Sequence, residues 1–216
     1  MLTIAIILAG VFLLVLLLCY IQGDNRYSVL PTKAALSSLF VITVLIQPHS
    51  IGGYYEFLLA GLVFCLLGDI FLALPQERMF LAGLMAFLAG HLLYIIGFYC
   101  VAKIGRWTGM GFMVIAAIGI MVYFQLRIFL GRMKVPVILY LIVISVMVTG
   151  AWSVFMNYHL AGSGRIMVFA GALLFCFSDL FVARNRFIKQ EFSNRLIGLP
   201  LYYTGQFLLA FSPGFL

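Results

Sequence analysis

Long apolar stretches separated only by short polar connectors run through the whole chain of 216 residues. Hydrophobic residues make up 65% of the sequence and charged residues 9%, whereas soluble domains are about half apolar and about a quarter charged. A helix needs about 20 mostly apolar residues to cross a bilayer. Eight stretches are candidates, the second of them short, and they lie roughly at residues 2–21, 34–47, 55–74, 80–102, 107–126, 135–155, 166–183 and 196–212. We therefore expect an all-α, polytopic membrane helix bundle that forms a single integral membrane domain over residues 1–216.

Basic residues in the connectors indicate how this bundle is oriented. The net charge is +7, and ten Lys and Arg residues follow the first, third, fifth and seventh stretches, against three on the opposite side. Loops rich in Lys and Arg stay in the cytoplasm, so both termini are predicted outside it, in a bacterial inner membrane. Topology accounts for the charge, and no nucleic-acid partner is expected. The first stretch lacks a preceding Lys or Arg and exceeds a signal-peptide core in length, so we expect it to be retained.

Two aspartates stand inside apolar stretches, each in a copy of the same phrase. Asp69 lies in GLVFCLLGDIFLA and Asp179 in GALLFCFSDLFVA, which align without a gap at an offset of 110 residues. The next stretches continue the match, with Gly90-His91 opposite Gly205-Gln206 after a connector five residues longer. The pattern predicts a 4+4 parallel internal repeat with halves at about 1–106 and 107–216, because four helices return the chain to the same side. Both aspartates should then lie at one depth, near the cytoplasmic face.

Each aspartate is a candidate functional residue, because a charge in hydrocarbon costs at least about 2.5 kcal/mol. We expect no Lys or Arg at their depth, so simple ion pairing is disfavoured. Desolvation and a nearby like charge then favour the protonated form of at least one carboxyl group. A neutral acid beside an ionised one is an arrangement suited to acid/base catalysis. A structural hydrogen-bonding role is the alternative.

Other polar side chains lie within reach of the same core. His91 can hydrogen-bond a carboxyl group or relay protons, or it can be a buried neutral ring held by a backbone carbonyl. Ser178 adjoins Asp179 but points about 100° away on a helix. Cys65 and Cys176 each precede an aspartate by one turn, yet the three or four spaced ligands of a zinc site are missing, so no metal and no cofactor are expected. The remaining group consists of Tyr94, Tyr140, Tyr202, Tyr203 and Gln206.

Several phrases in this order resemble the YhhN-type lysoplasmalogenase family. They are GLVFCLLGDIFLA with FLAGLMAFLAGHLLYIIGFY, then VPVILYLIVISVMVTGAW, then GALLFCFSDLFVARNRF with PLYYTGQFLLA. The hallmarks of that family correspond here to Gly68-Asp69, His91-x-x-Tyr94, Ser178-Asp179 and Tyr202-Tyr203-x-x-Gln206. The chain departs from the family near its second stretch, where a Lys-Pro pair is common and this sequence reads Pro31-Thr32-Lys33.

The resemblance implies hydrolysis of the vinyl ether bond of an alkenyl lysophospholipid. The expected partners are this substrate and the membrane lipids around the protein. Asp69 and Asp179 are then the expected catalytic acid and base, in either order. His91, Tyr203 and Gln206 would orient the water or the carboxyl groups, supported by Tyr94, Ser178 and Tyr202. Arg184 and Arg186, just beyond Asp179, would hold the lipid phosphate. The sequence leaves open a homo-oligomer and the head-group preference.

Two other functions are also consistent with the sequence. A proton- or cation-coupled transporter of lipids or small molecules could use the same aspartates, although transporters often break helices at such sites and these phrases contain no proline. A purely structural membrane subunit would tolerate asparagine at both positions.

Overall fold

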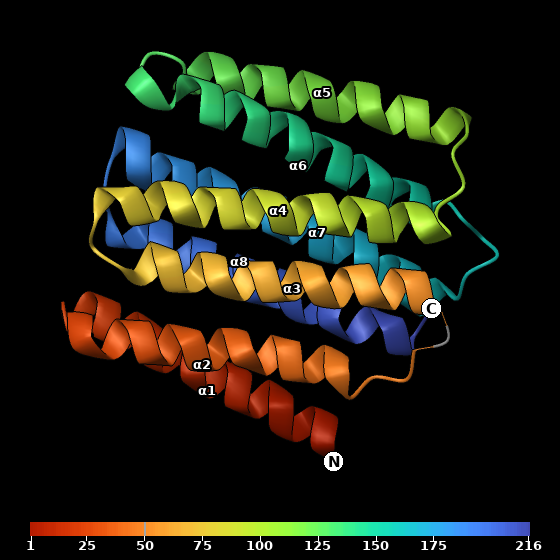
Figure 1. Cartoon of the computed structure of the whole chain (residues 1–216), viewed down its shortest axis with the longest axis horizontal. Coiled ribbons are helices and arrows are strands. Elements are labelled where there is room, and N and C mark those ends of the chain that lie inside the picture. The colour runs from red at the N-terminus through yellow and green to blue at the C-terminus, as the bar shows by residue number, and fades with distance from the viewer. Residues whose placement is uncertain (50) are drawn as a thin grey trace.

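The computed structural model describes residues 1–49 and 51–216, which form a bundle of antiparallel helices. Figure 1 shows them side by side, with both termini at the same end of the bundle. The α-helices are α1 (Leu2–Gln22), α2 (Arg26–Leu45), α3 (Gly52–Ala73), α4 (Glu77–Val101), α5 (Arg106–Leu126), α6 (Lys134–Phe155), α7 (Gly162–Ala183) and α8 (Phe192–Phe211). Short elements η1 (Gly131–Met133), η2 (Arg184–Ile188) and η3 (Ser212–Gly214) extend α6, α7 and α8. The predicted all-α class is confirmed.

Seven of the described helices, α1 to α7, are long and apolar enough to cross a membrane. The chain is therefore an integral membrane protein. Helix α8 was also predicted as a span and packs along α7, but its mean hydropathy is lowered by buried polar side chains such as Asn194, Tyr202 and Gln206. These side chains face the bundle, where neighbouring helices supply hydrogen-bond partners that lipid lacks.

The start of α2 is the largest boundary error of the sequence prediction. The apolar stretch was expected from residue 34, whereas the helix begins at Arg26 and contains Pro31 and Lys33. Hydropathy placed the boundary where the apolar residues begin, because polar residues and a proline usually mark a connector. Lys33 consequently lies inside the bundle, with only 11% of its side chain exposed.

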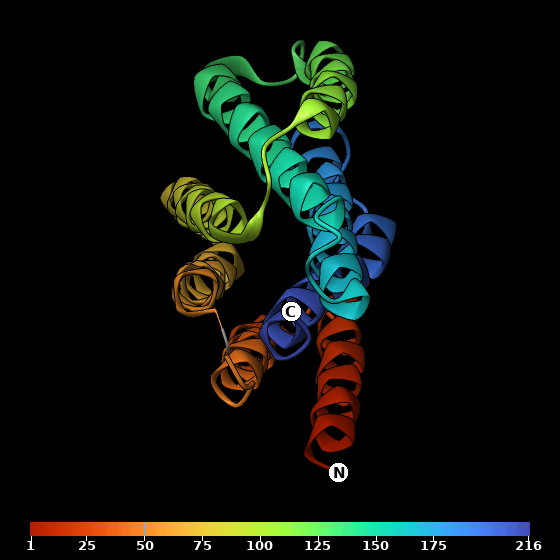
Figure 2. The same ribbon diagram turned by 90° about the vertical axis from the view of Figure 1, so that its right-hand side faces the viewer.

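Two tightly packed hairpins, α3/α4 and α7/α8, form the middle of the bundle. Figure 2 shows α5 and α6 towards one edge of the cross-section and α1 and α2 towards the other. A Cβ atom placed on Gly61 would lie 3.1 Å from the carbonyl oxygen of Gly90, and one on Gly171 would lie 2.9 Å from that of Gly205. Glycine at these positions lets the paired backbones touch, as in close helix contacts in membranes.

Candidate active site

The Asp69 carboxylate is almost completely buried and has partners on both oxygens. Lys33 Nζ lies 3.0 Å from Oδ1, while Ser37 Oγ and the Tyr202 hydroxyl donate to Oδ2 at 2.5 and 2.7 Å. Only 2% of the aspartate side chain is exposed. An ionised carboxylate can only accept hydrogen bonds, so two hydroxyl donors and an ammonium group suit the charged form.

Lys33 overturns the expectation that no basic group lies at the depth of the aspartates. Because α2 begins two turns earlier than predicted, the Lys33 ammonium group enters the bundle one turn before Ser37. Residues i and i+4 share a helix face, so both reach Asp69 on α3. The ion pair balances a charge that would otherwise be costly in hydrocarbon.

Tyr203 extends the Asp69 network away from the carboxylate. Its hydroxyl lies 3.3 Å from Ser37 Oγ, and its ring packs 4.8 Å from the Tyr202 ring, measured between centroids. The consecutive tyrosines of α8 thus reach the same network, one directly and one through Ser37.

Asp179 has a different environment. The Tyr140 hydroxyl donates to Oδ2 at 2.8 Å, and His91 Nε2 lies 4.0 Å from the same oxygen. The aspartate side chain is 19% exposed. Over residues 1–49 and 51–216, no Lys or Arg forms an ion pair with it. Asp179 therefore keeps an accessible carboxyl group without a permanent counterion.

His91 has the geometry of one of the two interpretations offered from the sequence, a buried ring held by a backbone carbonyl. Its Nδ1 lies 2.7 Å from the Phe87 carbonyl oxygen, which can only accept, so Nδ1 carries the hydrogen. In a neutral ring Nε2 is then an acceptor, and this buried atom has no hydrogen-bond partner among the described residues. The ring is held by the backbone, and Nε2 lies 4.0 Å from Asp179 Oδ2, beyond hydrogen-bond distance.

An aromatic cluster of Phe87, Phe175 and Tyr202 lies between the two aspartates. The Tyr202 ring packs 5.8 Å from Phe87 and 5.2 Å from Phe175, and Phe175 packs 4.5 Å from His91. Within the part of the chain that the structure describes, no hydrogen bond joins the two carboxyl groups. The aspartates thus share one bundle interior but have separate polar partners.

Three of the predicted supporting residues do not contact either aspartate. Tyr94 donates to Gln206 Oε1 at 2.8 Å and lies 3.6 Å from Cys65 Sγ. Ser178 donates to the Phe175 carbonyl oxygen at 2.7 Å, in line with its expected direction. Tyr94 and Gln206 therefore link α4 to α8, and Ser178 bonds within α7.

The two arginines predicted to bind phosphate lie on η2, beyond the end of α7. Arg184 is 3.7 Å from Glu191, and the Arg186 guanidinium group lies 4.5 Å from the centre of the Phe80 ring. Lys189 hydrogen-bonds Glu191 as well, and this contact lowers the pKa of the Glu191 carboxyl group. Both arginines thus lie at the end of the bundle to which Asp69 and Asp179 are nearest along their helices.

Sequence reasoning missed Lys33 and Ser37 and left Tyr140 unassigned. A lysine with serine four residues later, just before an apolar run, is a signal that could have placed both on one helix face. Tyr140 carried no comparable signal, because its contact with Asp179 joins residues 39 apart in the sequence.

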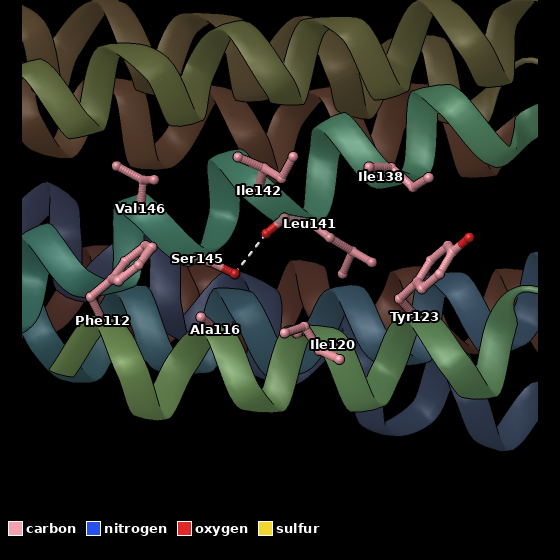
Figure 3. Close-up of a pocket in the computed structure, with 10 residues that line it drawn as sticks. Phe112, Ala116, Ile120, Tyr123, Ile138, Leu141, Ile142, Ser145 and Val146 are labelled. Carbon is pink, nitrogen blue, oxygen red and sulfur yellow. Dashed lines mark hydrogen bonds between the residues drawn. The ribbon is translucent and has the colours of Figure 1, made fainter. Parts of the chain in front are cut away.

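A cavity of about 410 Å³ between α5 and α6 lies away from both aspartates (Figure 3). Apolar side chains such as Phe112, Ile120 and Leu141 line it, and Ser145 turns its hydroxyl back to the Leu141 carbonyl oxygen at 2.7 Å. Among the described residues, no Asp, Glu, His, Lys or Arg lines this cavity, which is not part of the candidate site.

The fold and the buried acids define a polytopic α-helical membrane protein with ionisable groups in its interior. Residues 27–213 match the YhhN family, and the chain belongs to that family. It is 30% identical over 188 residues to "Lysoplasmalogenase TMEM86A" of Homo sapiens, covering 81% of this chain and 74% of the relative. It is 27% identical over 203 residues to "Lysoplasmalogenase" of Mycobacterium tuberculosis, covering 90% and 74%.

A bovine relative is also named "Lysoplasmalogenase TMEM86A" and is 29% identical over 156 residues, which cover 70% of this chain. The matched region spans 62% of the length of the bovine protein. No solved structure matches the chain.

Proposed function

We propose that this protein hydrolyses the vinyl ether bond of alkenyl lysophospholipids, giving a fatty aldehyde and a glycerophospho-head group. The observation that carries the proposal is the contrast at Asp179, an accessible carboxyl group with Tyr140 and His91 beside it and no cation. A carboxyl group without a cation in a membrane interior is favoured in its protonated form. Family membership and relatives named lysoplasmalogenase support the same substrate class.

In this proposal Asp179 is the catalytic acid. It transfers its proton to the β-carbon of the vinyl ether, and the carbon–carbon double bond becomes a carbon–oxygen double bond in an oxocarbenium ion. Water adds to the carbon of that ion and gives up a proton to the Asp179 carboxylate, directly or through His91 Nε2. The resulting hemiacetal separates into aldehyde and the free glycerol hydroxyl group. One water molecule is consumed and the acid is regenerated.

Asp69 is proposed as the fixed anion of the site. Lys33 and two hydroxyl groups hold its charge, so it is poorly placed to exchange protons during turnover. Its contacts orient Tyr202, whose ring packs on Phe175 and thereby on His91. Asp69 would act by positioning these groups and by lowering the potential near the developing cation.

We also propose that the two halves of the chain are a parallel repeat of four helices each. Gly61–Gly90 in α3/α4 and Gly171–Gly205 in α7/α8 are matching backbone contacts. The side chains next to the Asp69 carboxylate come from α2 and α8, and those next to the Asp179 carboxyl group come from α6 and α4. Each aspartate thus uses the second helix of its own half and the fourth helix of the other, as a two-fold arrangement requires. Each half would then complete the environment of the other's aspartate.

The orientation proposed for the bundle puts its basic end in the cytoplasm and both termini outside it. At this end, beyond α3 and α7, lie Arg78 in the first turn of α4, Arg184 at the start of η2, and Lys189. Asp69 and Asp179 lie four residues from the ends of their helices, or about 6 Å along the axis. If a lysolipid binds with its phosphate at these arginines, its vinyl ether bond lies just below the head group. That bond would then be at about the depth of the two aspartates.

The test is aldehyde release by the purified, detergent-solubilised protein from an alkenyl lysophospholipid. The matched substrate control is the saturated alkyl-ether lysophospholipid, which has no double bond to protonate and should yield no aldehyde. Failure to release aldehyde from alkenyl substrates across head groups and pH would refute the proposal. Proton-coupled uptake into liposomes in that case would favour the transporter alternative.

A further inference from the structure

An apolar groove of about 370 Å³ runs along the contact between α1 and α8. Figure 2 shows α1 beside the end of α8 that carries the C-terminus. The two helices are antiparallel, so Leu14 and Tyr203 line one end of the groove, and Thr3 and Phe215 line the other. Its lining contains no charged residue among the described positions.

The groove joins the candidate active site through a single residue. Tyr203 is one of the residues that line the groove, and its hydroxyl lies 3.3 Å from Ser37 Oγ, which in turn donates to Asp69. A ligand in the groove would therefore have one end against the polar network of Asp69. The α5/α6 cavity has no such connection in its lining.

In the middle of the groove the ring of Phe207 packs against Gly10. A Cβ atom on Gly10 would lie 3.3 Å from the ring of Phe207, which is tighter than an ordinary contact. The groove extends from Tyr203 in α8 to Phe215, just beyond η3 and twelve positions further along the chain, or about 18 Å at the rise of an α-helix. That length is similar to one leaflet of a hydrocarbon core about 30 Å thick.

We propose that this groove binds the hydrocarbon chain of the lipid substrate and sets the chain length that the enzyme accepts. The inference rests on the proposed function, because the chain would leave the reacting bond near the aspartates and enter the groove at Tyr203. Apolar walls suit an alkyl chain and exclude its head group. Helix α1 forms one wall and precedes the residues that match the family.

The test measures kcat/KM for alkenyl lysophospholipids with short, intermediate and long chains. Thr204→Trp fills the groove beside Tyr203, and Ile7→Trp fills it further along. Thr204→Trp should lower the ratio of long-chain to short-chain kcat/KM by at least about tenfold, the effect that one methylene in an apolar pocket can have. Ile7→Trp should lower this ratio only for the longest chain. Ala116→Trp in the α5/α6 cavity is the matched control and should leave it unchanged.

The ratio separates a filled groove from damaged folding, since a misfolded variant loses activity on all chains alike. If the wild type is active and Thr204→Trp shows the same dependence of kcat/KM on chain length, the groove proposal is wrong and the proposed function stands. A wild type without aldehyde release would overturn both. A non-hydrolysable alkyl-ether lysophospholipid carrying a photoreactive group at its chain end should label α1 and α8, and labelling confined to other helices would overturn the groove.

Discussion

Asp69 and Asp179 lie in matching sequence phrases in α3 and α7, yet their polar partners and their exposure differ. Asp69 has an ammonium group and two hydroxyl donors and is 2% exposed, whereas Asp179 has one hydroxyl donor, faces a histidine and is 19% exposed. A fully paired carboxylate is held in one protonation state, and an accessible one beside a neutral histidine can change its state. The contrast assigns proton transfer to Asp179 and positioning to Asp69 in the proposed reaction.

The largest expected effect is on catalysis at Asp179. Asp179→Asn keeps an oxygen for the Tyr140 hydroxyl but removes the acid, and we expect aldehyde release to fall by about 10² to 10⁴-fold, the usual contribution of general acid catalysis. Thermal stability in detergent should change little. Asp69→Asn serves as the comparison, and its activity per folded protein should fall less than that of Asp179→Asn, because Asp69 transfers no proton in the proposed reaction. Wild-type activity in folded Asp179→Asn would contradict the assignment.

The second effect concerns stability and should appear only at Asp69. Removing one partner of a buried ion pair typically costs about 3 to 5 kcal/mol, so Asp69→Asn should strongly destabilise the bundle by leaving Lys33 unpaired. Lys33→Gln combined with Asp69→Asn should recover most of that loss. Denaturant unfolding of the single and double variants gives the coupling energy. Additive losses in the double variant would mean that the ion pair contributes no coupling.

A third, smaller effect distinguishes two tyrosines that each donate to an aspartate. Tyr140→Phe removes the one hydroxyl donor of Asp179, whereas Tyr202→Phe leaves Asp69 with Lys33 and Ser37. A hydrogen bond to a charged group contributes about 1.5 to 3 kcal/mol, so Tyr140→Phe should lower kcat by about tenfold or more. Tyr202→Phe should lower it only a few-fold. Equal losses measured on folded protein would remove the distinction between the two sites.

The helices and the two aspartates could be predicted from the sequence because hydropathy and the repeated phrase are local signals. The partners of the aspartates could not. Lys33 looked like a connector residue because Pro31 and polar neighbours obscured the start of α2. The contact of His91 with Asp179 joins helices α4 and α7, and periodicity within one helix does not reveal which helices meet. The matching phrases suggested equivalent sites, whereas the charge difference arises from residues outside those phrases.

The smallest expected effect concerns the basic end of the bundle, where the arginines are proposed to contact the phosphate of the substrate. Arg184 is 54% exposed and already near Glu191, and exposed ion pairs contribute at most about 1 kcal/mol. Arg184→Gln should therefore raise KM for the lysophospholipid a few-fold with kcat unchanged, the pattern of lost ground-state binding, and the difference should shrink at high salt. Lys103→Gln removes one positive charge at the opposite end and should leave KM unchanged. If both substitutions raise KM equally, overall charge rather than a phosphate contact at Arg184 governs substrate binding.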